Sequence, residues 1–200
     1  MSELQELASR VHVCTDCRLS EGRTRAVPGE GPEQADLMFI GEGPGYHEDQ
    51  QGRPFVGPAG QFLEQLLASI GMRRDQVFIA NVVKCRPPNN RDPLPGEIAA
   101  CRKYLDHQIE LLQPKVIVTL GRFSLAQFFP NESISRAHGK PRAWNGRTVM
   151  PMYHPAAALH QGNMRGVIEE DFRKLPELLR ATAEAPPEPE APQPEQLSMF

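Results

Sequence analysis

Four short apolar runs, each bounded by turn-forming residues, punctuate the chain and predict buried β-strands. They cover residues 36–41, 77–83, 115–121 and 147–152. Within each run, apolar residues mostly follow one another instead of alternating with polar ones. That pattern is typical of strands in a parallel sheet that is covered on both faces.

Stretches with the apolar spacing of amphipathic helices lie between and after these runs. Residues 59–70 gather their apolar side chains on one side, and Gly71 follows as a helix stop. Residues 95–112 begin with a proline, which suits a first helical turn, and residues 123–129 and 165–183 predict a shorter and a closing helix. Alternating strands and helices predict an α/β fold, a three-layer α/β/α sandwich around a central four-stranded, mostly parallel sheet.

The C-terminal residues differ in composition from the rest of the chain. Residues 183–193 read AEAPPEPEAPQ, with no aromatic or β-branched side chain to bury. Such a segment predicts an extended, disordered linker. Apolar side chains return only in the last five residues, QLSMF. We therefore expect a globular domain over residues 1–182 and a flexible tail over residues 183–200.

Charge and hydropathy narrow the class of protein. The net charge of −3 includes four tail glutamates, and without them 22 bases balance 21 acids. A near-neutral body excludes DNA binding through bulk charge and leaves local loop cations for that task. The N-terminus lacks the pattern of a secretion signal, and no apolar run approaches the ~20 residues of a membrane span. We expect a soluble, cytoplasmic monomer with no membrane contact.

The residues that follow the predicted strands are the place to look for a site. Ligands of such sheets bind beyond the carboxyl ends of the strands. Asn81 lies near the end of the second strand, and we expect it to meet the segments that leave the strands. These segments are Gly41-Glu42-Gly43-Pro44-Gly45, Lys84-Cys85-Arg86-Pro87-Pro88, Gly121-Arg122 and Tyr153-His154-Pro155.

The four cysteines, Cys14, Cys17, Cys85 and Cys101, are the candidate metal ligands. The first two form a C-x-x-C pair, whereas the other two stand far apart. A zinc ribbon usually has two such pairs, so the spacing favours one cluster that ties the N-terminal segment to distant parts of the chain. Four thiolates fit one iron–sulfur cluster. A structural zinc site is the main alternative, and two disulfides fit less well because nothing marks the chain as secreted.

These motifs, taken in order with the cysteines between them, resemble the family 4 uracil-DNA glycosylases, the iron–sulfur members of their superfamily. The resemblance runs from about Cys14 to about Arg180. It implies a hydrolase of base excision repair that flips uracil out of single- or double-stranded DNA and cleaves its N-glycosidic bond. It also implies a structural [4Fe–4S] cluster on the four cysteines. The segments that carry it are residues 41–45, 48–49, 52–57, 81–88 and 152–156.

The resemblance assigns roles at the base. Asn81 would read the pairing edge of uracil, Phe55 would stack on the ring, and His154 would donate a hydrogen bond to uracil O2 as charge develops there. Gly43 stands where related enzymes of another family carry aspartate, so Glu42 is the favoured residue for positioning water. Glu48 would exclude the methyl group of thymine. Each residue also has an ordinary alternative. Asn81 could be a structural amide, Phe55 a core aromatic and His154 an uninvolved histidine. The two glutamates could belong to a solvated acidic turn.

Contacts with the DNA backbone are expected from loops. The candidates are Arg86, Pro87, Pro88, Gly121 and Arg165. Leu159 is the candidate wedge that would fill the vacated base stack, with a core contact as its alternative.

The last five residues resemble the short peptide by which bacterial repair proteins dock on the sliding clamp. Gln196, Leu197, Met199 and Phe200 would make that contact, unless the tail folds back on its own domain. A clamp-tethered damage sensor without turnover is the alternative for the whole protein, and Gly43 with Tyr46-His47 favours it. A covalent uracil-DNA binder and an electron-transfer protein fit less well. We expect the enzyme to work at the nucleoid.

Overall fold

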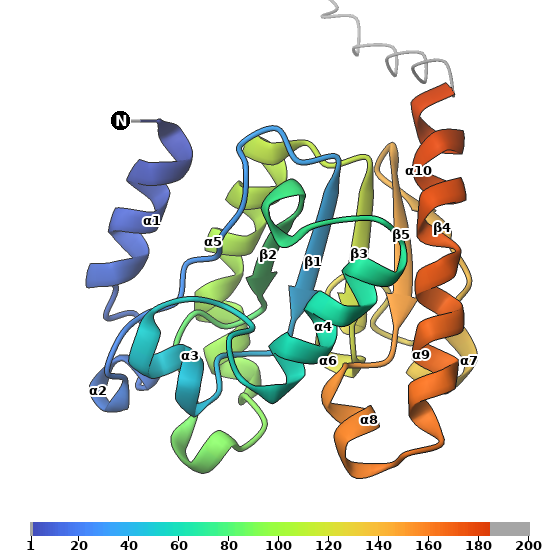
Figure 1. Cartoon of the computed structure of the whole chain (residues 1–200). Helices are drawn as coiled ribbons and strands as arrows, with labels where there is room; N and C mark the ends of the chain where they lie inside the picture. The colour runs from blue at the N-terminus through green and yellow to red at the C-terminus, as the bar shows by residue number, and fades with distance from the viewer. Residues whose placement is uncertain (1, 185–200) are drawn as a thin grey trace, which may run out of the picture.

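The computed structural model describes residues 2–184, in which a five-stranded sheet lies between two layers of helices (Figure 1). The strand order is β2-β1-β3-β5-β4, and only the β4–β5 pair is antiparallel. The predicted α/β/α sandwich is confirmed. The strands are β1 (Leu37–Gly41), β2 (Phe78–Asn81), β3 (Val116–Leu120), β4 (Arg142–Trp144) and β5 (Arg147–Met152).

The sheet has one strand more than the sequence predicted, so the expected number of four was wrong. β4 and β5 form a hairpin around Asn145-Gly146, whose φ angles of 46° and 70° are both left-handed. An Asn-Gly pair is the usual residue choice for such a two-residue turn. β4 is only three residues long and none of its residues is buried. It therefore carries no apolar run that could have marked it.

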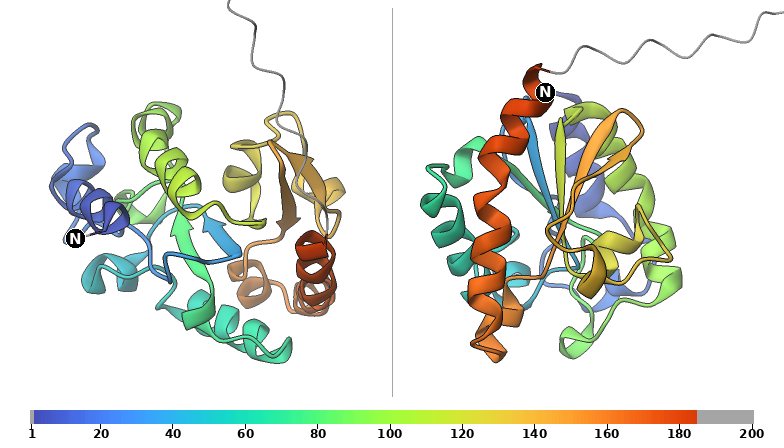
Figure 2. Two further views of the ribbon diagram at one scale, coloured as in Figure 1. Left: turned by 90° about the horizontal axis from the view of Figure 1, so that it is seen from above. Right: turned by 90° about the vertical axis from the view of Figure 1, so that its right-hand side faces the viewer.

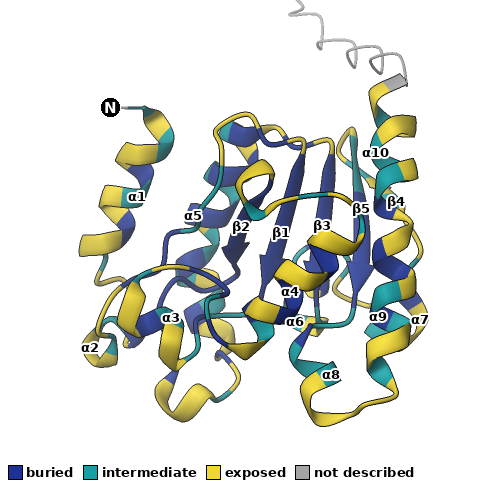
Figure 3. Cartoon of the chain, in the orientation of Figure 1, coloured by how far each residue is buried: buried dark blue, intermediate teal, exposed yellow. Residues whose placement is uncertain are grey.

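Helices cover both faces of the sheet, as the two views in Figure 2 show. α4 (Pro58–Ser69), α9 (Met164–Arg173) and α10 (Leu175–Glu184) supply one face, where the rings of Phe39 and Phe172 stack at 5.7 Å. α1 (Glu3–Val13) and α5 (Pro95–Leu112) supply the other. Figure 3 shows that β1, β2, β3 and most of β5 are buried, which explains their continuous apolar sequence.

Short elements form the connections at the carboxyl ends of the parallel strands (Figure 1). α3 (Tyr46–Gln51), η2 (Pro88–Asn90), α6 (Arg122–Ala126) and α8 (Ala156–His160) follow β1, β2, β3 and β5 in turn. The remaining short elements are α2 (Leu19–Gly22), η1 (Arg74–Gln76) and α7 (Ile134–Ala137). The segments singled out in the sequence thus gather at one edge of the sheet.

The closing helix is interrupted, although the sequence predicted one helix over residues 165–183. α9 ends at Arg173 and α10 begins at Leu175. Pro176 has no N–H to donate to the carbonyl of Phe172, which accounts for the break. α10 reaches Glu184, and the remaining tail lies outside the described residues. Within residues 2–184, no helix has both the length and the apolar character required to cross a bilayer.

Candidate active site

A cavity of about 630 Å³ opens at the edge of the sheet where β1, β2 and β5 end. An amide at the end of β2 and an imidazole after β5 meet there with an aromatic ring from the segment between α3 and α4. Eight of the residues singled out in the sequence line it: Glu42, Gly43, Glu48, Phe55, Asn81, Pro87, His154 and Leu159.

Asn81 ends β2, directly opposite Gly41 of β1. Its side chain is 1% exposed, and its Oδ1 atom has no hydrogen-bond partner among the described residues. A Cβ atom on Gly41 would lie 2.4 Å from Oδ1 and 2.7 Å from the Phe55 ring. Glycine therefore lets the amide and the ring lie together. An unpaired buried acceptor costs about 1–3 kcal/mol, so this oxygen is suited to accept a hydrogen bond from a ligand.

Phe55 and His154 form an aromatic pair in the cavity wall, with centroids 5.4 Å apart and ring planes at 26°. The Ala156 N–H donates to Nδ1 of His154 at 3.1 Å. The neutral ring must then carry its proton on Nε2. Burial lowers the pKa of His154 to about 4, although the charge of Glu48 acts in the opposite direction. At neutral pH, His154 is therefore an uncharged donor through Nε2.

The two glutamates of the cavity are held differently. Glu42 makes no side-chain hydrogen bond within the described residues, and its pKa is raised, first by burial and then by the charge of Asp92. Glu48 is fully engaged. Its Oε1 accepts the N–H groups of Val56 and Gly57, both at 2.8 Å, and its Oε2 accepts that of Gly45 at 3.1 Å. Glu42 is thus the carboxylate available for chemistry.

Gly43 lies against the wall of the cavity. A Cβ atom there would lie 2.7 Å from Cγ2 of Val83, so an aspartate at this position would displace a stiff β-branched side chain. Gly121 has a left-handed φ of 92°, and a Cβ atom added there would lie 3.4 Å from Cβ of His154. Gly43 therefore avoids a steric clash, and Gly121 adopts a backbone conformation that favours glycine.

The residues expected to contact DNA border the cavity only in part. Pro87 and Leu159 line it, and Leu159 is 50% exposed, which excludes the alternative of a core contact. The guanidinium of Arg86 lies over the Tyr46 ring at 5.2 Å. Arg165 does not line the cavity; it pairs with Glu169 at 2.9 Å and lies over the Phe62 ring of α4.

Several other residues of the cavity wall had no site role assigned from the sequence. Asn90 and Arg91 follow the Pro-Pro motif by two and three residues, and Arg91 is one of the loop cations left for local DNA contacts. Arg91 makes two hydrogen bonds to Glu97, at 2.7 and 2.9 Å, and its side chain is about one-third exposed. The others are Pro44, Gly45, Tyr46, His47, Gly57, Pro58, Ala59, Ala156 and His160.

The four cysteines line a second, small cavity. Cys14 and Cys17 come from the turn after α1, Cys85 from the segment after β2, and Cys101 from α5. Two N–H groups donate to sulfur, that of Arg23 to Cys85 at 3.0 Å and the Lys84 backbone to Cys101 at 3.3 Å. Burial raises the pKa of Cys85, and that of Cys101 to about 11.

Four thiols are the donor set of a Cys₄ iron–sulfur site. In residues 2–184, no group of three or more His, Cys, Asp or Glu side chains is arranged to hold one metal ion. Each thiolate of a [4Fe–4S] site binds a different iron, so its sulfurs lie farther apart than the ligands of a single ion. Four cysteines around one cavity, with N–H donors to two sulfurs, match such a site.

Lys84 connects the two cavities. Its ammonium group is buried and donates to the backbone carbonyl of Asn81 at 2.8 Å and to Gln108 of α5 at 2.6 Å. Its backbone N–H donates to the sulfur of Cys101 at 3.3 Å. Lys84 therefore links the backbone of Asn81 to α5, the helix that carries Cys101.

Comparison with known proteins agrees with this geometry. The family model described as the uracil DNA glycosylase superfamily matches residues 28–178. The chain is 51% identical to the type-4 uracil-DNA glycosylase of Sulfurisphaera tokodaii over 89% of this chain and 86% of that protein. It is 46% identical to the type-4 enzyme of Thermotoga maritima, over 89% of this chain and 96% of that one. A type-5 uracil-DNA glycosylase of Pyrobaculum aerophilum is 30% identical over 66% of each chain. The chain therefore belongs to the uracil-DNA glycosylase superfamily and, within it, to the type-4 enzymes.

Proposed function

We propose that the protein is a monofunctional uracil-DNA glycosylase, which hydrolyses the N-glycosidic bond of uracil in DNA and leaves an abasic site to initiate base excision repair. The observation that carries the proposal is the unpaired Oδ1 of Asn81, buried in a cavity beside the Phe55 ring and the neutral imidazole of His154. The names of the relatives support the same activity.

Uracil in a duplex is stacked and paired, so the enzyme must extrude the nucleotide before it reads the base. Uracil offers an N3–H donor between two carbonyl acceptors. Oδ1 of Asn81 accepts from N3–H, and the amide nitrogen donates to O4. Cytosine lacks the N3–H donor and carries an amino group in place of O4, so a fixed amide rejects it. Phe55 stacks on the extruded ring.

Cleavage leaves negative charge on the departing uracil and positive character on the sugar. The Nε2–H of neutral His154 donates to uracil O2 as that charge grows, and such a donor stabilises the transition state more than the ground state. Glu42 positions the attacking water on the sugar. Its raised pKa makes the carboxylate a stronger hydrogen-bond acceptor for that water.

DNA is held around the mouth of the cavity. Pro87 and Pro88 let the main chain approach the strand, Arg86 and Arg165 contribute positive charge, and Gly121 gives close access beside His154. Leu159 fills the space that the extruded base leaves, a role supported by its exposure at the cavity rim.

Cys14, Cys17, Cys85 and Cys101 hold a [4Fe–4S] cluster, whose chemistry here is structural cross-linking and not electron transfer. The shared cavity and the two N–H donors to sulfur support this assignment. The protein's own contribution is to connect the N-terminal turn, the segment after Asn81 and α5 at one point.

The C-terminal peptide adds a docking function for the bacterial sliding clamp through Gln196, Leu197, Met199 and Phe200. These residues lie outside the described part of the chain, and their sequence alone supports the proposal. Truncation after Gln193 is expected to abolish clamp pull-down and to leave cleavage of short oligonucleotides unchanged. Unchanged pull-down would contradict the proposal.

The activity is tested with oligonucleotides that carry one uracil, in single- and double-stranded form, followed by alkali to cut abasic sites. We expect cleavage by the wild type and a loss of about 10²–10³-fold in His154→Ala, the usual cost of removing one such donor. Asn131→Ala, on an exposed loop, is the control. Tight binding of uracil-DNA without abasic product would instead support the damage sensor.

A further inference from the structure

The backbone of Phe55 has an unusual conformation for an aromatic residue. Its φ angle of 51° lies in the left-handed region. A non-glycine residue in that region costs on the order of 1–3 kcal/mol and persists only where its surroundings impose it. Phe55 lies in the segment between α3 and α4, where no strand or helix fixes its backbone. Something outside the segment must therefore hold the ring in the cavity.

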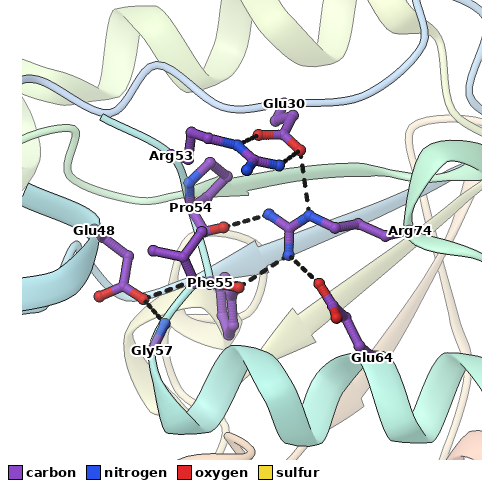
Figure 4. Close-up of polar contacts among 9 residues, drawn as sticks. Glu30, Glu48, Arg53, Pro54, Phe55, Gly57, Glu64 and Arg74 are labelled. Carbon is purple, nitrogen blue, oxygen red and sulfur yellow. Dashed lines mark hydrogen bonds and ion pairs between the residues drawn. The ribbon is translucent and has the colours of Figure 1, made fainter. Parts of the chain in front are cut away.

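Two charged side chains bind the backbone polar groups on either side of the Phe55 ring (Figure 4). Arg74 donates one guanidinium N–H to the Phe55 carbonyl at 2.9 Å and another to the Pro54 carbonyl. Glu48 accepts the N–H groups of Val56 and Gly57. Residues 54–57 thus each have one backbone group bound by a side chain. The first two carbonyls accept from Arg74, and the last two N–H groups donate to Glu48.

Arg74 is itself fixed in place. It stands in η1, is only 14% exposed, and contacts Glu30 at 3.2 Å and Glu64 of α4 at 3.5 Å. Glu30 also binds Arg53 through two hydrogen bonds, at 2.6 and 2.7 Å. The backbone of Glu30 exchanges two hydrogen bonds with Ile79 of β2. The guanidinium that holds Phe55 is therefore anchored to the same strand that carries Asn81.

We propose that Arg74 is a positioning residue for uracil excision, which holds the Phe55 backbone in its left-handed conformation and so sets the ring at the place where the base stacks. Arg74 does not line the cavity and does not touch the base. The inference rests on the proposed stacking role of Phe55. It extends the site to a residue outside every motif that the sequence displayed.

The test is a double-mutant cycle in the full chain, with single-turnover cleavage of a uracil oligonucleotide at several enzyme concentrations. Arg74→Met keeps much of the side-chain volume and removes the donors, and Arg74→Lys keeps the charge but cannot bridge two carbonyls and Glu30. Arg73→Met is the matched control, because the neighbouring Arg73 is 71% exposed and pairs only with Asp75 among the described residues. Each variant is made with Phe55 and with Phe55→Ala.

We expect Arg74→Met to slow cleavage by roughly 10–100-fold, since a small misplacement of a positioning group has effects of that size. Arg74→Lys should fall between it and the wild type. In the Phe55→Ala background, Arg74→Met should change the rate by less than about twofold, because the ring through which it acts is gone. Arg73→Met should leave the rate unchanged in both backgrounds.

Several results would overturn the inference. A full loss that recurs in the Phe55→Ala background would show a general structural role, and a wild-type rate in Arg74→Met would show none. An equal loss in Arg73→Met would assign the effect to net charge. If Arg74→Met does not fold, Arg74→Lys carries the same cycle. A wild-type rate in Phe55→Ala alone would instead refute the stacking role of Phe55, which separates the two failures.

Discussion

Asn81 and Phe55 meet in one cavity, but the protein holds them by different means. Asn81 is the last residue of β2, in register with Gly41, and the backbone ladder of a parallel sheet fixes it. Phe55 lies between two helices in a left-handed conformation, and the side chains of Arg74 and Glu48 bind the backbone around it. A strand position is maintained by many weak bonds, whereas the loop position depends on a few charged groups. Substitutions at residues placed by the sheet and at residues that support the Phe55 loop should therefore change the cleavage rate by different amounts.

After His154, the largest effect is expected at Glu42, which directly follows β1 and is therefore placed by the sheet. Glu42→Gln removes the carboxylate that positions water and should lower the single-turnover rate by about 10²-fold or more. The wild-type rate should fall as pH drops through the raised pKa of Glu42, because protonation removes the acceptor. His154, with a pKa lowered to about 4, titrates below the raised pKa of Glu42 and so stays neutral through most of that limb.

The measurement is a pH–rate profile of the wild type and of Glu42→Gln. The acidic limb should disappear in the variant. Glu110→Gln, on an exposed position of α5, is the control and should keep both the rate and the limb. An acidic limb that persists unchanged in Glu42→Gln would show that another group positions the water.

A smaller loss is expected at Asn81. Asn81→Ala removes the amide that pairs with the base, and a pair of hydrogen bonds of this kind discriminates by about 1–3 kcal/mol, so uracil cleavage should fall by roughly 10–100-fold. The free protein should not lose stability in proportion, because the unpaired Oδ1 is removed with the side chain. Cleavage rates and thermal melting of the variant and of Asn131→Ala check this. A large drop in Tm with an unchanged rate would contradict it.

The same contrast explains what the sequence could predict. Asn81 lies near the end of the apolar run over residues 77–83, so the pattern placed the strand and its amide at the correct edge of the sheet, although β2 already ends at Asn81. His154 follows β5 in the same way. β4 was missed because three partly exposed residues carry no pattern, and the closing helix was taken as continuous because one proline does not show in apolar spacing.

The support of Phe55 was not predictable for a different physical reason. Arg74 precedes β2 by a few residues and reads as an ordinary surface base beside Arg73, and Glu30 reads as an acid in a loop. Only the fold brings them to the carbonyls of Pro54 and Phe55. Glu48 was expected to exclude the methyl group of thymine and does line the cavity, but the sequence did not show that both its oxygens bind backbone N–H groups. Long-range contacts of charged side chains leave no periodic signal.

The smallest effect is expected from a single methyl group added next to the loop that carries Phe55. Gly60 lies in α4 beneath Phe55, and a Cβ atom there would lie 1.9 Å from the Phe55 carbonyl oxygen. Gly60→Ala favours the helix by about 1 kcal/mol. The clash nevertheless forces the Phe55 backbone away from α4, and we expect a loss of about tenfold in the cleavage rate.

Gly166→Ala in α9 is the matched control, because nothing lies within 4 Å of the added methyl group. It should keep the wild-type rate and a Tm at least as high. Cleavage rates and melting curves of the two variants measured side by side separate helix propensity from loop displacement. A wild-type rate in Gly60→Ala would mean that the ring tolerates movement of its backbone. The left-handed conformation would then be a by-product of packing, and Asn81 and His154 alone would set the position of the base.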